Sequence, residues 1–289
     1  MIDKPYDMGS TQVVSVLKHF LQPTKIGHAG TLDPLATGVL PIAFGKATRL
    51  IPYVMAGKKT YQFTIKWGVE TDSDDLAGKE IATSDKIPTE DEIRSVLPKF
   101  VGEIMQTPSA FSALKVNGKR AYELAREGKE VEIKPRSVTI YDLKILEIQQ
   151  DKATLEVQCS KGTYVRSLAH DIAHALGTVG VVIMLRRTFC LPFDLTQAVA
   201  VDEIKTGKIT VENLPLIPME TVVQDMPKIA FSINEIRRLS QGQRLSLPKL
   251  EISQKPTQDG IFCAENGGKI CGLVCLNGVV ISPEFIWQT

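Results

Sequence analysis

The chain has 289 residues, of which 43% are hydrophobic and 23% are charged. This composition excludes a disordered chain, and the length favours two domains over a single core. The 34 Lys and Arg against 33 Asp and Glu leave a formal net charge of +1, which excludes histone-like proteins, so any polyanionic partner must be attracted by local basic patches.

The cysteines and the N-terminus indicate where the protein works. The five cysteines are an odd number without a C-x-x-C pair, so we expect a reducing compartment and no zinc site among them. The segment Met1–Pro5 carries an acid, a base and a proline where a signal peptide needs an apolar core, and no apolar run approaches about 18 residues. These features predict a cytoplasmic protein with no membrane segment.

The first elements follow from the spacing of apolar residues. A helix is predicted from Ser10 or Thr11 to about Leu21, because apolar residues recur at helical spacing after a capping hydroxyl. Residues 25–50 are rich in Gly, Thr and Pro, which favours tight turns over regular elements and is typical of loops that carry sites. A half-buried strand begins at Lys59, because polar residues alternate with Tyr61, Phe63, Ile65 and Trp67; an acidic turn closes it.

The middle of the chain mixes helices and strands. Thr89 to Glu92 reads as a capping box that opens a helix. Asn117-Gly118 predicts a turn and Lys119–Gly128 a short helix. Strands are predicted at 138–148 and 153–159, and then a helix from about Tyr164 to Leu176. Because regular βαβ crossovers are missing from this pattern, it predicts a mixed α/β fold of the α+β kind, with a largely antiparallel central sheet.

A second, smaller domain is expected at the C-terminus. Prolines thin out the periodic pattern near residues 214–227, as in a linker. Beyond them come a helix with a capping box, Ser232–Gly242, and short β segments broken by glycines, as expected for a small barrel or sandwich. We therefore divide the chain into residues 1–221, a catalytic domain, and 222–289, a β-rich domain.

The most informative stretch is Gly27–Pro41, whose one carboxylate is Asp33. Pro34 pushes the backbone of Asp33 to the extended region, which restricts the direction of its side chain. The surrounding glycines would allow a substrate to approach the backbone closely. An Asp-Pro turn is also common chemistry for a plain loop, so the pattern by itself leaves both interpretations open.

The run GHAGTLDPLATGVLPIAFGKATR resembles the catalytic signature of the TruB family of tRNA pseudouridine synthases. The resemblance extends along the chain through five further motifs. These are Ile2–Pro5, Lys59-Thr60-Tyr61, Gln106-x-Pro108-x-x-Phe111–Lys115, Cys159–Leu168 and Leu185-Arg186-Arg187.

The resemblance implies an isomerase with a pseudouridine synthase fold that uses neither a metal nor an organic cofactor. Such an enzyme breaks the N-glycosidic bond of uridine 55 in the T-loop of tRNA, rotates the base and rejoins it through carbon. The catalytic aspartate of the family falls on Asp33. Whether this carboxylate attacks the sugar or removes a ribose proton is left open.

Arg166 is the expected partner of Asp33. A carboxylate in a pocket for an uncharged base would be desolvated, which raises its pKa unless a cation compensates. The active-site arginine of the family falls on Arg166, which follows a Lys161-Gly162-Thr163 turn where a strand enters a helix. A guanidinium could keep the carboxylate charged and fix its direction. The plain alternative is an arginine on a surface helix.

Aromatic and apolar residues complete the expected pocket. A uridine in a folded loop must be flipped out and stacked, and the resemblance assigns that role to Tyr61, which could also act as an acid or base. Periodicity alone would place Tyr61 in the core. Tyr164 and Leu185 match positions that complete the pocket wall in the family, although either could be core.

Two further residues are assigned to substrate binding by the resemblance. His28 falls on a histidine that lies against the T-loop in the family, and the alternative is a turn histidine bonded to backbone. Lys4 belongs to the motif Ile2–Pro5 at the start of the chain.

The expected partner is tRNA, bound through its T-arm stem-loop by phosphate contacts and shape. Residues 115–136 hold seven Lys or Arg against four Glu, and residues 227–250 hold five against one. By family analogy the second patch belongs to a PUA-like RNA-binding domain. We expect a monomer without an obligate protein partner. The alternatives are a non-catalytic RNA chaperone and a guide-directed synthase acting on another RNA.

Overall fold

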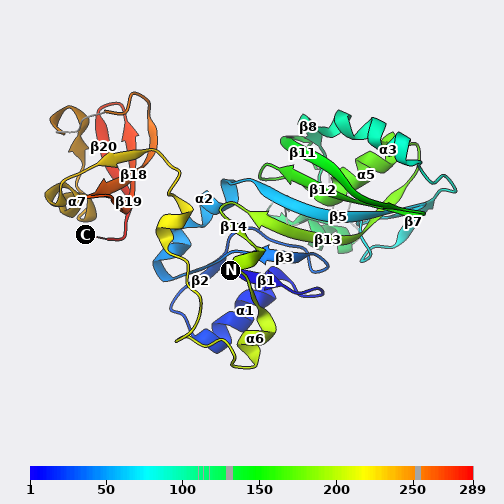
Figure 1. The fold of residues 1–289 in the computed structure, drawn as a ribbon, viewed down its shortest axis with the longest axis horizontal. Coiled ribbons are helices and arrows are strands. Elements are labelled where there is room, and N and C mark those ends of the chain that lie inside the picture. Colours follow the sequence, from blue (N-terminus) through cyan, green and yellow to red (C-terminus); the bar gives the residue numbers. More distant parts are fainter. Residues whose placement is uncertain (110, 113, 117, 128–132, 251–254, 289) are drawn as a thin grey trace. The chain divides into compact units, whose positions relative to one another are not determined.

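The computed structural model describes the chain except residues 110, 113, 117, 128–132, 251–254 and 289. The chain forms two compact units (Figure 1). The first unit comprises residues 1–22, 27–42 and 54–215, and the second comprises 23–26, 43–53 and 216–289. Each unit therefore takes its residues from separate stretches of the chain.

A mixed, largely antiparallel sheet forms the centre of the first unit, as predicted. Its neighbours pair antiparallel except β1 with β15 and β3 with β13, which are parallel. In spatial order the strands are β15 (Val199–Ala200), β1 (Ile2–Lys4), β3 (Thr37–Leu40), β13 (Gly180–Cys190), β5 (Lys59–Trp67), β12 (Lys152–Cys159), β11 (Arg136–Gln149) and β8 (Gly102–Gln106), and β14 (Phe193–Asp194) pairs with β13.

The main core lies between one face of this sheet and two helices. Phe63, Ile65 and Trp67 of β5 are buried on that face, and Tyr61 packs against them. The helices α3 (Glu90–Val96) and α5 (Val165–Ala175) cover it with their own apolar residues. On the opposite face Gln62 donates to Glu156, so the alternation in the sequence reflects the two sides of the sheet.

The helix α1 (Ser10–Leu21) was predicted, but its capping residue was not. The cap is Gly9, whose N–H donates to Gln12 Oε1 at 2.6 Å. The Ser10 hydroxyl instead accepts from Leu32 N at 2.8 Å and donates to Leu32 O at 2.9 Å. The prediction of a hydroxyl cap was wrong because Ser10 is used to hold the loop that contains Leu32.

The Gly-rich segment 25–50 also contains more regular structure than predicted. Besides β3, it forms β2 (Ile26–His28), β4 (Ile42–Phe44) and a 3-10 helix, η1 (Gly45–Leu50). Gly38 explains why this composition can still build a strand. A Cβ at Gly38 would lie 2.1 Å from the Arg187 carbonyl oxygen, so only glycine allows β3 to approach β13 this closely.

Smaller elements complete the first unit. Part of the predicted helix 119–128 is instead a strand, because Lys119 and Arg120 pair back onto Val116 and Lys115. Asn117 of the predicted turn and Gly128 of the predicted helix end lie outside the described residues. The remaining elements are α2 (Ile51–Ala56), whose first residues belong to the second unit, β6 (Val69–Thr71) paired with β7 (Glu80–Thr83), β9 (Lys115–Val116) paired with β10 (Lys119–Arg120), α4 (Ala121–Arg126), α6 (Val201–Lys205), and the 3-10 helices η2 (Leu97–Phe100) and η3 (Leu195–Gln197).

The second unit is built on a sheet of its own and one helix, α7 (Ile233–Ser240), opened by the predicted Ser232–Glu235 capping box. The sheet order is β16 (Lys228–Ala230), β18 (Gly260–Asn266), β19 (Lys269–Asn277), β20 (Val280–Ile286) and β17 (Leu245–Ser246). The 3-10 helices η4 (Met219–Val222) and η5 (Leu247–Lys249) also belong to it. Within the described part of the chain, helices are too short or too polar to cross a bilayer.

Candidate active site

Asp33 and Arg166 form an ion pair in the first unit. Arg166 Nε lies 2.9 Å from Asp33 Oδ2. The Arg166 side chain is 4% exposed, whereas that of Asp33 is 35% exposed. The carboxylate can therefore be reached from solvent while its counter-charge lies inside the protein. The alternative of an arginine on a surface helix does not describe Arg166.

Buried groups hold the Arg166 guanidinium in place. Arg166 lies in the first turn of α5, just after the turn that follows β12. Its Nη1 donates to Ser73 O at 2.6 Å and lies 3.5 Å from Asp75 Oδ2, and its Nη2 donates to Phe111 O at 3.0 Å. Because these contacts use several directions of the planar group, the edge that faces Asp33 has a defined orientation.

The turn that carries Asp33 is held on both sides. The Ser10 hydroxyl bonds both backbone groups of Leu32. The Lys4 ammonium donates to Pro34 O at 3.0 Å and to Pro5 O and Met8 O. Asp33 therefore lies between two residues whose backbones are fixed by buried side chains.

Lys4 has a different environment from the one expected of a substrate-binding residue. It is fully buried, and its ammonium group donates to three carbonyl oxygens. Burial lowers the pKa of Lys4 to about 8, and the nearby Asp33 and Asp7 oppose this shift. These contacts give Lys4 a positioning role in the Asp33 turn, and they do not show an amine turned toward RNA.

A small cavity, open to solvent, lies beside the ion pair. Asp33, Arg166 and Asp75 supply its charged groups, and Leu185 is among the apolar residues of its wall. Tyr61, Tyr164, His28 and Lys4 are not among the described lining residues. The structure thus brings three of the sequence-predicted site residues, Asp33, Arg166 and Leu185, to one cavity.

Tyr61 and His28 both lie near a further arginine, Arg187. Arg187 is 1% exposed, donates to Val39 O at 2.7 Å and Gly30 O at 3.2 Å, and lies 6.0 Å from the centre of the Tyr61 ring. Burial raises the pKa of Tyr61 to about 12, although Arg187 opposes the shift. Burial, and then Arg187, lower the pKa of His28, whose buried Nδ1 has no hydrogen-bond partner among the described residues.

The backbone of Tyr164 is held by the side chain of Gln106. Tyr164 precedes α5, and the buried Gln106 side chain accepts from Tyr164 N at 2.7 Å and donates to Tyr164 O at 3.0 Å. The Arg136 guanidinium lies 4.7 Å from the centre of the Tyr164 ring. Gln106 thereby fixes the start of the helix that carries Arg166.

Known proteins resemble this chain along most of its length. The model of the TruB family pseudouridylate synthase (N terminal domain) matches residues 18–165, more than half of the chain. The model of the tRNA pseudouridylate synthase B C-terminal domain matches residues 166–224. The chain belongs to the TruB family.

Individual relatives agree with this TruB assignment. The tRNA pseudouridine synthase B of Caulobacter vibrioides is 41% identical and is matched over 99% of this chain and 94% of its own length. That of Gluconobacter oxydans is 47% identical over 85% of this chain and 76% of its own length. The protein is therefore an enzyme, an isomerase that forms pseudouridine in tRNA, as the sequence motifs predicted.

A solved structure confirms the predicted fold class. A Cbf5–Nop10–Gar1 complex contains a chain with a TM-score of 0.73 and 26% identity, covering 99% of this chain and 83% of that one. The TruB chain therefore has the pseudouridine synthase fold, with a central mixed sheet and a small C-terminal β-rich domain.

Three residues at or near the TruB site were not among those predicted. Asp75 lines the cavity, Arg187 holds the backbones of Gly30 and Val39, and Gln106 holds Tyr164. Each lies in a stretch that the sequence analysis singled out, the acidic turn after β5 or a family motif. Their roles depend on contacts between distant segments, which a single sequence does not show.

The possible metal ligands of the described chain are not residues of this site. The five cysteines are free thiols, and Cys271 and Cys275 share no disulfide. Among the described residues, the side chains that could ligate an ion together are Glu70, His170 and His174. None of these three belongs to the described lining of the Asp33 cavity.

Proposed function

We propose that this enzyme isomerises uridine 55 in the T-loop of tRNA with Asp33 as its catalytic carboxylate. The observation that carries this proposal is the ion pair between partly exposed Asp33 and buried Arg166 at the wall of an open cavity. The guanidinium pairs with the carboxylate without covering it, so the carboxylate is available to a nucleotide. Either attack on the sugar or removal of a ribose proton needs such a group.

The target nucleotide would enter this cavity by base flipping. A base inside a folded loop cannot reach a carboxylate, so it must leave the stack and be held elsewhere. Leu185 supplies an apolar wall beside Asp33. We assign stacking on the flipped base to Tyr61 and completion of the pocket to Tyr164, on the family resemblance. His28 is proposed to lie against the T-loop; its lowered pKa favours the neutral ring at neutral pH.

Phosphate contacts are assigned partly to residues 222–289 as a PUA-like RNA-binding domain. The basic residues of the patch 227–250 support this role, since all of them are exposed. They are Lys228, Arg237, Arg238, Arg244 and Lys249. The enzyme is proposed to act alone, as a monomer without a guide or an obligate protein partner.

The test uses the purified full chain and an unmodified tRNA transcript with no additives. Pseudouridine is mapped by chemical labelling, and affinity is measured separately by fluorescence anisotropy. We expect product at position 55 alone, also on an isolated T-arm stem-loop. Asp33→Asn should bind tRNA with wild-type affinity and form no product. The matched control is Asp142→Asn, which makes the same chemical change at a side chain 53% exposed on β11 and should act like wild type.

Each alternative function gives a different result. A chaperone that binds and refolds tRNA would be unaffected by Asp33→Asn. A guide-directed synthase would leave the bare transcript unmodified until a guide and partner proteins were added. Product at another position would contradict the T-loop assignment while leaving the isomerase activity intact.

A further inference from the structure

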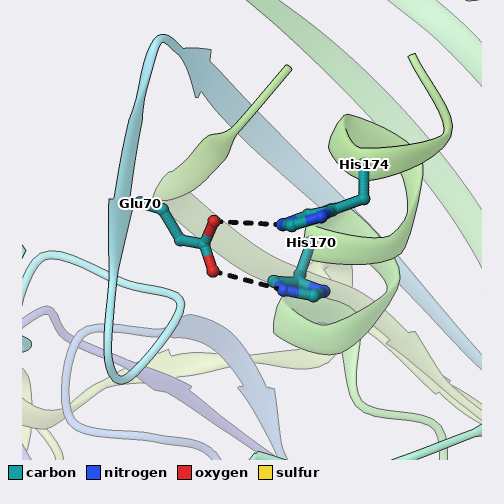
Figure 2. A group of neighbouring side chains, drawn as sticks. All are labelled: Glu70, His170 and His174. Carbon is teal, nitrogen blue, oxygen red and sulfur yellow. Dashed lines mark hydrogen bonds and ion pairs between the residues drawn. The ribbon is translucent and has the colours of Figure 1, made fainter. Parts of the chain in front are cut away.

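A cluster of Glu70, His170 and His174 lies outside the cavity (Figure 2). His170 and His174 are four residues apart on α5, so they share one helix face. Their rings stack with centroids 4.1 Å apart. Glu70, on β6, directs one carboxylate oxygen at each ring, at 3.3 Å from His170 Nε2 and 3.0 Å from His174 Nε2.

His170 has a second carboxylate neighbour, Asp171, at its other ring nitrogen, Nδ1. His170 Nδ1 is 3.3 Å from Asp171 Oδ1, and this contact is satisfied when Nδ1 carries the proton. A neutral His170 then presents the lone pair of Nε2 to the Glu70 carboxylate. Two acceptors at this separation repel unless a cation lies between them. In this tautomer the cation is either a second proton on the ring or a metal ion. In the other neutral tautomer His170 Nε2 carries the proton and donates to Glu70, and Nδ1 faces Asp171 as a second acceptor.

The geometry suits a metal ion. Tetrahedral zinc with bonds of about 2.0–2.1 Å keeps its ligand atoms about 3.3 Å apart. Each imidazole Nε2 lies near this distance from one of the two Glu70 oxygens, His170 Nε2 from Oε1 and His174 Nε2 from Oε2. All three donor atoms lie within 4.8 Å of one another. A carboxylate on the outer nitrogen, as Asp171 provides, commonly orients zinc-bound histidines. The side chains of His170 and His174 are 33% and 49% exposed, which leaves solvent access for entry and for a fourth ligand.

We propose that Glu70, His170 and His174 form a zinc-binding site that ties β6 to α5. Imidazole nitrogens select zinc over calcium or magnesium, which prefer oxygen ligands. The site lies one helical turn from Arg166. The segment that begins with Glu70 continues to Ser73 and Asp75, which both contact Arg166. Bound zinc therefore holds the segment that orients the guanidinium. This inference does not depend on the proposed RNA position.

Zinc binding to the full-length protein tests the site directly. The purified chain is stripped with a chelator, and Zn²⁺ is titrated by competition with a coloured chelator. We expect one ion per chain with a Kd below about 10 μM, and a rise in the melting temperature as zinc is added. Glu70→Gln and His174→Asn should each weaken binding by more than about tenfold and abolish the thermal shift, while Asp171→Asn should weaken it by about tenfold.

The matched control is His19→Asn, which removes an exposed histidine on α1 and should leave both readouts unchanged. Co²⁺ titration of the wild type gives a test that needs no variant, because four-coordinate Co²⁺ in a protein site has much more intense ligand-field bands than hydrated Co²⁺. If the wild type binds no zinc at this concentration, or if His174→Asn binds as tightly as wild type, the cluster holds only protons and the proposal is wrong.

Discussion

Asp33 combines exposure with a fixed position because its support comes from its neighbours. Its side chain is 35% exposed and forms one ion pair. The backbones of Leu32 and Pro34 are bonded by Ser10 and Lys4, which are buried. A reacting carboxylate must meet substrate and yet not move, and this arrangement separates the two requirements. The hydrogen bonds to Leu32 and Pro34 restrict the backbone of Asp33, and its own carboxylate stays accessible.

Arg166→Ala should lower turnover by at least about 100-fold while changing tRNA affinity little. The substitution leaves Asp33 and the largely buried Asp75 without their cation, so we also expect a loss of about 3–5 kcal/mol in stability. Single-turnover rates and anisotropy, measured on protein shown to be folded, separate the two effects. Arg94→Ala is the control, since it removes an arginine 59% exposed in a surface pair. Equal losses of rate and affinity would contradict the role of Arg166.

Tyr61 should titrate later than an ordinary tyrosine, because burial raises its pKa to about 12. Absorbance at 295 nm should show a late ionisation that Tyr61→Phe removes. The folded state holds this proton between the ordinary pKa of about 10 and 12, so the contribution of Tyr61 to stability is complete below pH 10 and is lost as the pH rises to 12. At neutral pH its hydroxyl can donate a hydrogen bond but cannot act as a phenolate base.

The RNA-binding role of Tyr61 predicts a different pattern among its variants. If the ring stacks on the flipped base, Tyr61→Phe keeps tRNA affinity and Tyr61→Ala weakens it, by about 1–3 kcal/mol. Indistinguishable affinities for the two variants would leave Tyr61 as a core residue only.

At the level of single residues, the sequence indicated chemistry better than it indicated contacts. Asp33, Arg166 and Leu185 were predicted through family motifs and lie at one cavity. Lys4 was predicted as a binding residue, whereas the structure shows its ammonium bonded to carbonyl oxygens. Asp33 and Lys4 are both charged residues in motifs that the TruB family shares. Lys4 is buried and Asp33 is partly exposed, and this difference depends on segments far away in the sequence.

At the level of elements, predictions succeeded where one face of an element is apolar. The strand β5 and the helices α1 and α5 show clear periodicity and were expected. The central strand β13 was not predicted, although its first half is an apolar run, residues 181–185; Arg186 and Arg187 stand side by side in its second half. Arg186 pairs with Asp3, and Arg187 is buried against backbone carbonyls. Charges satisfied by distant partners therefore conceal how far this strand continues beyond its apolar half.

A substitution at Gly38 tests whether β3 and β13 must approach each other as closely as the structure shows. Gly38→Ala should cost about 4 kcal/mol or prevent folding, because its Cβ would lie 2.1 Å from the Arg187 carbonyl oxygen. Gly102→Ala is a matched control: its φ of 103° nearly equals the 102° of Gly38, and no atom lies within 4 Å of its new Cβ. The control should lose only the conformational cost, about 1–3 kcal/mol. Equal denaturation midpoints would show that β3 can move away from β13.

At the level of the whole molecule, one continuous motif contributes to both compact units. The run that begins at Gly27 supplies Asp33 to the first unit, and its residues from Ala43 belong to the second. The sequence predicted a boundary after residue 221, whereas the second unit of the structure begins again at Leu216 and includes residues 43–53. Linker composition can indicate where a chain leaves a domain, but it cannot show that an earlier segment has joined the next one.

The shared segment predicts how truncation fails. Leu50 is 2% exposed and packs with Val223, Leu273 and Phe285 of the second unit's core. A chain that ends at Pro215 therefore exposes Leu50, and we expect it to aggregate. Leu50→Gln should reduce that aggregation in the truncated chain, yet destabilise the full chain by about 2–5 kcal/mol. Light scattering and thermal melts measure the two effects.

Leu50→Gln should help the truncated chain and harm the full chain, and these opposite effects would identify Leu50 as part of the second unit's core. Leu216→Gln is the control in the full chain, because Leu216 is 69% exposed and should tolerate the same change within about 0.5 kcal/mol. A full chain that is indifferent to Leu50→Gln would show that residues 43–53 contribute nothing to the second unit. In that case the C-terminal residues would fold independently of the segment that follows Asp33, and truncation at Pro215 would leave a soluble catalytic unit.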